Sequence, residues 1–171
     1  MTTRLAEPAD IPQIMSLIGN VVPTMNAAGN FQWDHTYPNA EAFTKDIEQQ
    51  QLWLALIDNK IAGIAAITTD QYPEYAEVGL NINETAIVVH RLAVDPAYQG
   101  KGVAKFLMQK AEDLAIDRHI GVLRIDTNSK NVTTQALFLK LGYRFAGEMG
   151  LSFRPDMRFY CYEKRLDKKP V

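Results

Sequence analysis

The sequence predicts an α/β protein built on a mixed sheet with a central β-α-β crossover. Short apolar runs alternate along the chain with longer runs whose apolar residues recur at helical spacing. In mid-chain, the apolar run Thr85–Val94 is followed by a helical pattern over Gly102–Arg118 and by another apolar run at Val122–Asp126. The 171 residues contain no Pro/Gly/Ser-rich linker. Because about 100 to 200 residues make one domain, a single domain over 1–171 is expected.

The first half of the chain predicts a strand, two helices and a hairpin. Asp10 is placed as the N-cap of the first helix, with Pro12 in its first turn, and Asn39 as the cap of the second. Residues 58–60 join the hairpin strands without settling the turn type. The expected elements are a strand at Thr2–Leu5, a helix from Asp10, an irregular stretch at Asn20–Pro38, a helix from Asn39 to about Gln50, and hairpin strands at Leu52–Ile57 and Ile61–Thr68.

The second half continues the alternation of strands and helices. Gly142 follows a helical run, which is typical of a helix C-terminus. The expected elements are a loop at Thr69–Asn83 with at most a short strand, a strand at Thr85–Val94, a helix at Gly102–Arg118, a strand at Val122–Asp126, a helix at Asn131–Leu141, and strands at Tyr143–Met149 and Met157–Leu166.

Composition excludes several classes of protein. A net charge of −2 argues against nucleic-acid binding, which favours a basic face. The single cysteine, Cys161, rules out an intrachain disulfide and a cysteine-based zinc cluster, and no metal is expected. No apolar run approaches the roughly 20 residues of a membrane span. The N-terminal MTTRLAEPAD lacks the apolar core of a signal peptide, so a cytoplasmic protein without a membrane partner is expected.

A glycine-rich turn lies between the strand that ends at Val94 and the following helix. Its sequence is Gln99-Gly100-Lys101-Gly102-Val103-Ala104. The first N–H groups of a helix have no intrahelical partner, and the helix dipole makes this end positive. Glycines let the chain curl so that several N–H groups converge on one anion, and Lys101 adds a charge. The alternative is a tight turn without a ligand. The spacing fits neither the P-loop nor the Rossmann pattern.

At these residues the sequence resembles a known family. The segment HRLAVDPAYQGKGVAKFLM resembles the central Q/R-x-x-G-x-G/A motif of the GCN5-related N-acetyltransferases, or GNAT family, read here at Gln99, Gly102 and Ala104. A second segment, NVTTQALFLKLGY over Asn131–Tyr143, is similar to the family's Asn-x-x-Ala-x-x-Leu-Tyr-x-Lys-x-Gly-Phe segment. The resemblance implies a mostly antiparallel sheet of six or seven strands with helices on both faces.

The resemblance also implies acetyl-CoA as cosubstrate. Its pyrophosphate would lie on N–H groups of the glycine turn. Asn131 would hydrogen-bond the far end of the cofactor, near the pantetheine arm. In this family the arm pairs like a strand with the preceding strand, and Phe138 occupies the position of the tyrosine that protonates the CoA sulfur. The implied cofactor-binding residues are Leu92, Ala93, Val94, Gln99, Gly100, Lys101, Gly102, Val103, Ala104, Asn131 and Phe138.

Three residues are candidates for proton transfer. His90 lies two positions before Leu92, so strand alternation predicts that both point to one face, and its ordinary pKa of about 6.5 suits a base. Glu84 starts the same strand and is a second candidate through bound waters, although a solvated carboxylate is the simpler interpretation. Phe138 has no proton to give, so Tyr143 is a candidate acid. The alternative is that the thiolate leaves unassisted.

The irregular stretch Asn20–Pro38 is dense in aromatics. Together with a tyrosine of the later loop, they predict an acceptor pocket in which rings surround an amine and a carboxylate attracts it. The predicted acceptor-binding residues are Phe31, Trp33, Asp34, Tyr37 and Tyr75. The alternative is that these aromatics anchor a long loop onto the core. Arg154 and Asp156, expected in the last hairpin loop, are further candidates, and Cys161 is expected to pack in the core.

The function predicted by these residues and by the resemblance is N-acetyl transfer from acetyl-CoA to a primary amine by direct attack in a ternary complex. The acceptor is expected to be a small molecule or a peptide. A CoA-binding regulatory or interaction module with weak or no catalysis is the alternative, and a nucleotide-phosphate binder is a third. Dimerisation is common in the resembled family, so a homodimer is an expected option that no pattern here demonstrates.

Overall fold

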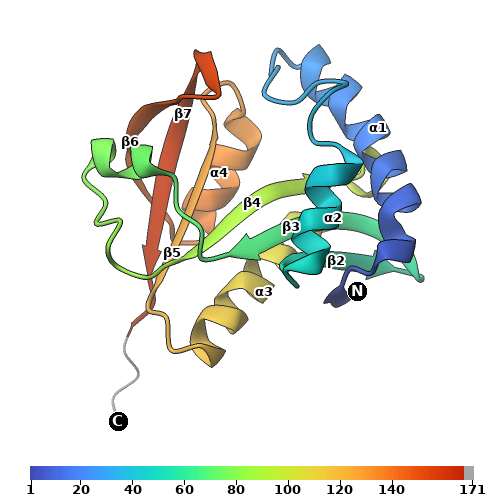
Figure 1. The fold of residues 1–171 in the computed structure, drawn as a ribbon, viewed down its shortest axis with the longest axis horizontal. Coiled ribbons are helices and arrows are strands. Elements are labelled where there is room, and N and C mark those ends of the chain that lie inside the picture. Colours follow the sequence, from blue (N-terminus) through green and yellow to red (C-terminus); the bar gives the residue numbers. More distant parts are fainter. Residues whose placement is uncertain (168–171) are drawn as a thin grey trace. The chain divides into compact units, whose positions relative to one another are not determined.

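The structure is a computed structural model that describes residues 1–167. Residues 168–171, the end of the predicted domain 1–171, lie outside the described residues. Figure 1 shows the elements in chain order: β1 Thr2–Leu5, η1 Pro8–Asp10, α1 Ile11–Ala27, α2 Ala40–Glu48, β2 Leu52–Ile57, β3 Lys60–Thr68, η2 Pro73–Val78, β4 Ile87–Val94, η3 Pro96–Tyr98, α3 Val103–Asp117, β5 Val122–Asn128, α4 Val132–Lys140, β6 Arg144–Leu151 and β7 Arg154–Arg165.

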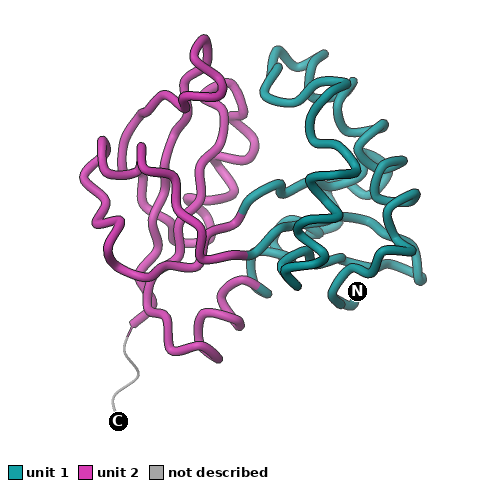
Figure 2. The backbone as a smooth tube through the Cα atoms, viewed as in Figure 1, with its two compact units in different colours: residues 1–67, 90–110 teal, residues 68–89, 111–171 magenta. Residues whose placement is uncertain are grey.

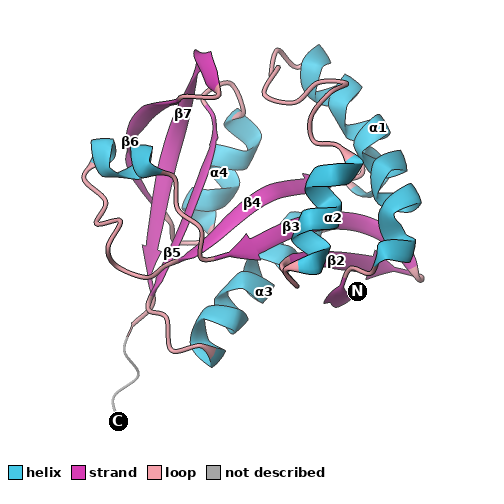
Figure 3. Cartoon of the chain, viewed as in Figure 1, coloured by secondary structure: helices cyan, strands magenta, loops and turns pink. Residues whose placement is uncertain are grey.

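The strands form a mixed, mostly antiparallel sheet, as predicted. Seven strands follow the order β1-β2-β3-β4-β5-β7-β6 (Figure 3). Strands β4 and β5 are parallel neighbours joined through α3, which is the predicted crossover, whereas β1/β2, β2/β3, β5/β7 and β6/β7 are antiparallel. Because sequence-adjacent strands dominate this order, the two hairpins form locally and the parallel pair depends on the crossover helix.

The chain divides into two compact units (Figure 2). Unit 1 comprises Met1–Ile67 and His90–Lys110, and unit 2 comprises Thr68–Val89 and Ala111–Val171. Each unit has its own buried apolar cluster. Strand β4 begins in unit 2 and ends in unit 1, so the glycine turn that follows it belongs to unit 1.

Unit 1 carries helices on both faces of its strands. From α1 and α2, Ile14 and Phe43 join Leu54 in one buried cluster. On the opposite face, Val103 of α3 lies so close to Gly63 of β3 that a Cβ there would be 2.6 Å from Val103 Cγ1. The β2–β3 turn has positive φ at both central residues, 58 and 59, which is the type I′ geometry favoured in hairpins.

Unit 2 is built on β5, β7 and β6. Cys161 of β7 is fully buried with Tyr75 and Phe159, and its sulfur lies 3.2 Å from that of Met149, which is the packing role expected for it. Leu151 pairs directly with Arg154, so residues 152–153 make the last turn.

Three expected boundaries were wrong. Arg154 and Asp156 lie in β7 and not in a hairpin loop, because the antiparallel ladder extends to a tight turn. The expected loop Thr69–Asn83 contains the 3₁₀ helix η2 and no short strand. Helix α1 continues past Pro23 to Ala27 instead of ending near Asn20. Pro23 has no N–H and so loses one helical bond, but Met25, beyond the proline, packs against the same buried cluster as Val21, and this packing holds the last turns.

Among residues 1–167, no helix is both long and apolar enough to cross a bilayer.

Replacing Gly63 by alanine tests the packing of α3 on β3. A Cβ at Gly63 would lie 2.9 Å from the backbone oxygen of Ala93, which has little room to move. We expect Gly63→Ala to lower the free energy of unfolding by about 1 to 3 kcal/mol through overpacking. Gly19→Ala in α1 is the matched control, since nothing lies within 4 Å of the added Cβ, and it should gain about 0.5 to 1 kcal/mol from helix propensity. Urea unfolding of both variants measures this difference, and equal effects would contradict the described packing.

Candidate functional site

The glycine turn of unit 1, residues 99–104 and here called the cradle, contains two glycines with left-handed backbone. Gly100 and Gly102 adopt left-handed φ values of 76° and 78°, and nothing lies within 4 Å of a Cβ built on either. Both glycines are exposed. Before the turn, the Asp95 carboxylate caps η3 by accepting from the Ala97 N–H at 2.9 Å, and the Asp95 N–H donates to the Ala62 carbonyl at 2.9 Å. The cradle is therefore anchored to β3 at its entrance.

The six backbone amides predicted to bind the pyrophosphate fall into two groups, those that donate a hydrogen bond within the structure and those that do not. The Gln99 and Lys101 N–H groups donate to the carbonyls of Pro96 and Tyr98 in η3, each at 3.3 Å. The N–H of Phe106 makes the bond to the Gly102 carbonyl at 3.0 Å, so the amides just before it precede the first helical bond. Among residues 1–167, no hydrogen bond engages the four remaining amides of the motif, which belong to Gly100, Gly102, Val103 and Ala104. These four N–H groups therefore have no acceptor among the described residues.

Lys101 lies on the exposed rim of the cradle. Its Nζ is 5.1 Å from the centre of the Tyr98 ring, a cation–π arrangement. This placement keeps a positive charge beside the glycines without inserting a side chain among the amides.

The end of β4 is interrupted at Arg91, which has a left-handed φ of 51°. A left-handed residue breaks the alternation of a strand, so the expectation that His90 and Leu92 share a face does not carry across it. The proposed role of His90, which is half-buried, thus depends on other observations.

The Arg91 side chain is held by α2 and by the loop before it. Its Nε and Nη2 donate to the Asp46 carboxylate at 2.7 and 2.6 Å, and Nη1 donates to the Tyr37 hydroxyl at 3.1 Å. Burial opposes the charge of Arg91, but the bonds to Asp46 and Tyr37 more than offset it and raise the pKa of the guanidinium. This group of three side chains was not predicted from the sequence, in which an arginine inside an apolar strand was its only signal.

The predicted acceptor residues of unit 1 have structural roles except one. Trp33 is buried in the core, and Tyr37 packs against the same cluster. The Asp34 carboxylate accepts from the N–H and Oγ1 of Thr36 at 2.8 and 2.6 Å, which fixes the loop. Phe31 is 58% exposed and remains available to a ligand. These contacts favour the alternative in which the aromatics anchor the loop.

Tyr75, the acceptor candidate of unit 2, does not line an open rim. Its ring is fully buried, and its hydroxyl donates to Asp126 Oδ1 at 2.6 Å. Burial and, next, the Asp126 carboxylate raise the pKa of Tyr75 well above its ordinary value. The role of Tyr75 in the structure is to tie η2 to β5.

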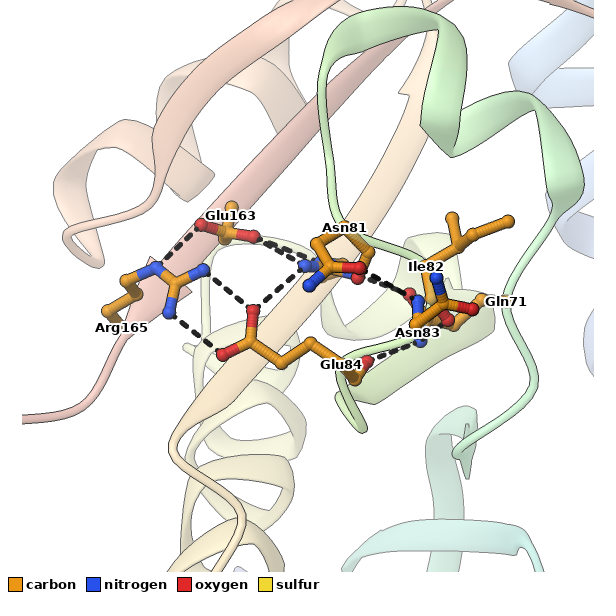
Figure 4. A network of polar contacts seen from close by, with 8 residues as sticks. Gln71, Asn81, Ile82, Asn83, Glu84, Glu163 and Arg165 are labelled. Atoms are coloured by element: carbon orange, nitrogen blue, oxygen red, sulfur yellow. Dashed lines mark hydrogen bonds and ion pairs between the residues drawn. The ribbon is translucent and has the colours of Figure 1, made fainter.

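Glu84 belongs to a network of charges in unit 2 (Figure 4). Its carboxylate accepts from Arg165 at 3.0 and 2.8 Å and lies 3.5 Å from Arg124 Nη2. The hydrogen bond from Arg165 is the main reason that the pKa of Glu84 is lowered. A carboxylate held by two arginines is a weak base, so this geometry favours a structural role.

The centre of that network is Arg124, which has no exposed side-chain area. Its Nε donates to Glu163 at 3.0 Å, and its Nη1 donates to the Asn81 carbonyl at 2.9 Å and to the Gln71 side chain. Its Nη2 lies 2.9 Å from Glu163, an ion-pair distance without hydrogen-bond geometry. Gln71 also donates to the Glu84 carbonyl at 2.8 Å. The network thus joins the loop before β4 to β5 and β7 (Figure 4).

The second predicted motif, Asn131–Tyr143, begins just before α4 and ends just after it. Asn131 caps α4 by accepting from Thr134 N–H at 3.4 Å, and it donates to Thr127 Oγ1 at 3.1 Å. Phe138 is 1% exposed and packs between Tyr143 and Tyr162. The Tyr143 hydroxyl is buried and has no hydrogen-bond partner among the described residues, and burial raises its pKa. A phenol with a raised pKa is a poorer proton donor.

Within residues 1–167, no group of three or more His, Cys, Asp or Glu side chains is arranged to hold a metal ion.

Comparison with known proteins decides the family. The model of the acetyltransferase (GNAT) family matches residues 23–143, more than half of the chain. The chain belongs to the GNAT family. GNAT acetyltransferases use acetyl-CoA, so the predicted family and cosubstrate are confirmed at this level.

The curated relatives align with this chain over only part of their own length. An N-acetylaspartate synthetase from Xenopus tropicalis is 25% identical over 126 residues, which cover 70% of this chain and 42% of that protein. The N-alpha-acetyltransferase RimI from Mycobacterium tuberculosis is 34% identical over 59 residues, which cover 34% of this chain and 35% of that protein. The chain thus spans less than half the length of these curated relatives.

Solved GNAT structures match nearly the whole chain. A GNAT-family acetyltransferase from Streptococcus agalactiae has a TM-score of 0.85 and 30% identity, covering 98% of this chain and 96% of that one. An acetyltransferase from Salmonella typhimurium, solved with acetyl-CoA, has a TM-score of 0.70 and 18% identity, covering 100% and 96%. The second likeness concerns the fold alone.

Truncating Glu163 tests the buried charge network. Glu163→Ala removes the ion-pair partner of a fully buried arginine, and we expect a loss of about 3 kcal/mol or more in the free energy of unfolding. Glu148→Ala is the matched control, since it removes an exposed partner of Arg158 at 3.1 Å and should cost below about 1 kcal/mol. Urea unfolding compares the two. A Glu163→Ala loss as small as that of the control would contradict the claim that Glu163 compensates the buried charge of Arg124.

Proposed function

We propose that this protein transfers an acetyl group from acetyl-CoA to a primary amine. The observation that carries the proposal is the pair of left-handed glycines that leaves four amides open at the start of α3. Such a site binds phosphate groups through convergent N–H donors. Membership of the GNAT family supports CoA as the phosphate-bearing ligand.

Two features of the cradle support a diphosphate as its ligand. Exposed glycines admit a bulky anion without a Cβ in its way, and Lys101 adds a positive charge. We assign the amides of Gly100, Gly102, Val103 and Ala104 to the pyrophosphate, and the backbone of residues 92–94 to the pantetheine arm. When bound, acetyl-CoA supplies the acetyl thioester.

Three tasks then fall to the chain. A base must take a proton from the amine, and we assign His90, because it lies two positions before the segment 92–94 and because histidine is the side chain most often used for this task. Backbone N–H groups of residues 92–94 polarise the carbonyl oxygen as it becomes negative. The third task, protonation of the leaving thiolate, has no donor in the second motif, because Phe138 has no proton to give and Tyr143, after the end of α4, is a buried phenol with a raised pKa; the thiolate leaves unassisted.

The acceptor class is a small-molecule or peptide amine. The relatives are an N-acetylaspartate synthetase, a streptothricin acetyltransferase and an N-alpha-acetyltransferase. We therefore propose a screen of aspartate, streptothricin and a peptide with a free N-terminal amine, with release of free CoA thiol as the readout.

A second candidate function is a CoA-binding regulatory module. Phe138, fully buried at the position of the family's acid, favours it. This candidate predicts CoA binding without thiol release for every amine in the screen. Transfer to any of the three acceptors would exclude it.

Calorimetry with two ligands tests whether CoA is the preferred ligand. We expect the protein to bind CoA more tightly than ATP, which a general nucleotide-phosphate binder would not do.

The cradle itself is tested by adding a methyl group to it. Gly102→Ala disfavours the left-handed turn and should weaken CoA binding about tenfold or more.

Gly29→Ala is the matched control for the cradle variant. Gly29 has a φ of 82° and no atom within 4 Å of an added Cβ, so its backbone penalty is similar. CoA affinity should be unchanged in this variant. Equal weakening in both variants would contradict the cradle, and so would a wild-type protein that binds no CoA at millimolar concentration.

His90→Ala tests the proposed base. Removal of a general base should lower kcat by roughly a hundredfold or more near neutral pH, while the Kd for CoA stays the same. Initial rates measured with the best acceptor, together with calorimetry, separate the two effects. An unchanged kcat would exclude His90 as the base without affecting the cradle.

A further inference from the structure

The backbone of β4 is held in an unusual conformation at Arg91. Its φ of 51° places an arginine in a region that favours glycine. A conformation of this kind persists only where the surrounding structure enforces it. The contacts that hold Arg91 in this conformation therefore also determine the backbone path at the end of β4.

The side chain of Arg91 supplies the restraint. Its guanidinium meets the Asp46 carboxylate in a two-pronged arrangement at 2.7 and 2.6 Å, with the Tyr37 hydroxyl at 3.1 Å from the third nitrogen. Asp46 lies on α2 and its side chain is 5% exposed, whereas that of Arg91 is 17% exposed. A bidentate pair of a guanidinium and a carboxylate fixes the relative orientation of the two groups as well as their distance. The half-buried arginine is thus fastened to a helix that packs on the core of unit 1.

The next three residues are the strand segment assigned to the pantetheine arm. Rotation about φ of Arg91 would turn the peptide groups that follow it. At the other end of the segment, the Asp95 N–H donates to the Ala62 carbonyl at 2.9 Å. Residues 92–94 are thereby held at both ends, by the Arg91 conformation and by the anchor on β3.

We propose that Arg91 is a positioning residue: its ion pair with Asp46 holds the left-handed bend that aims the backbone of residues 92–94 at the acyl-CoA arm. This inference rests on the proposed function, because the arm is its ligand. Arg91 acts through the backbone and does not touch the reacting atoms. A purely stabilising ion pair would lower the melting temperature when broken but leave CoA affinity intact.

Asp46→Asn breaks the ion pair while keeping the shape of the side chain. We expect it to weaken CoA binding and to raise KM for acetyl-CoA, each about tenfold, with a smaller change in kcat. The double variant Asp46→Asn/Arg91→Gly removes both charges and places at 91 the residue that adopts positive φ without strain. It should regain CoA affinity to within about threefold of the wild type.

Asp10→Asn is the matched control. It breaks another two-pronged pair of unit 1, in which Arg4 donates to Asp10 at 2.7 and 2.8 Å. Its CoA affinity should equal that of the wild type, even if its melting temperature falls as much as that of Asp46→Asn.

The measurements are calorimetric CoA affinity, steady-state kinetics and melting temperature for all four proteins. Wild-type affinity in Asp46→Asn, or a double variant that regains none of the lost affinity, would overturn the positioning role and leave the acetyl-transfer proposal standing. A wild type that binds no CoA would instead overturn the acetyl-transfer proposal and this inference with it.

Discussion

The site depends on a constraint of helix geometry: the first amides of a helix cannot bond within it. At the start of α3, two exposed glycines with left-handed φ turn the entering chain into the helix. Two amides of the turn are satisfied by nearby carbonyls, and four are left open. The rest of unit 1 supports this arrangement, because the entrance of the turn is fastened to β3 and α3 packs on Gly63.

Each unit also contains an arginine whose charge is largely removed from water. Arg91 in unit 1 and Arg124 in unit 2 are each paired with a carboxylate and bonded to a further oxygen. Such pairs gain little net stability, because desolvation opposes the attraction. They do fix the orientation of the chain segments that they join. In unit 1 the fixed segment is the end of β4, and in unit 2 it is the loop between β3 and β4.

Local signals in the sequence predicted most elements. Asn39 caps α2 through the Ala42 N–H, and Gly142 follows α4 with a φ of 86°. Both depend on neighbours within a few residues, which a sequence displays. The continuation of α1 past Pro23 was missed, because burial of the apolar stripe against distant strands outweighs one lost helical bond.

The cradle was predictable and the charged pairs were not. Glycine spacing before a helix is a local pattern, whereas Arg91 and Asp46 are 45 residues apart and nothing in the sequence joins them. Aromatic density in the loop before α2 predicted an acceptor pocket, with anchoring of the loop onto the core as the alternative. It could not reveal that Trp33 faces the core, because the same residue type serves packing and binding equally well.

The most direct test of the account is a titration of ¹⁵N-labelled protein with CoA, followed through its backbone amide signals. The account predicts that Gly100, Gly102, Val103 and Ala104 shift most strongly at saturation, and that dephosphorylated pantetheine, which lacks the pyrophosphate, does not reproduce these shifts. Saturable CoA binding that leaves these four signals unmoved would contradict the claim that open amides of the glycine turn bind the diphosphate.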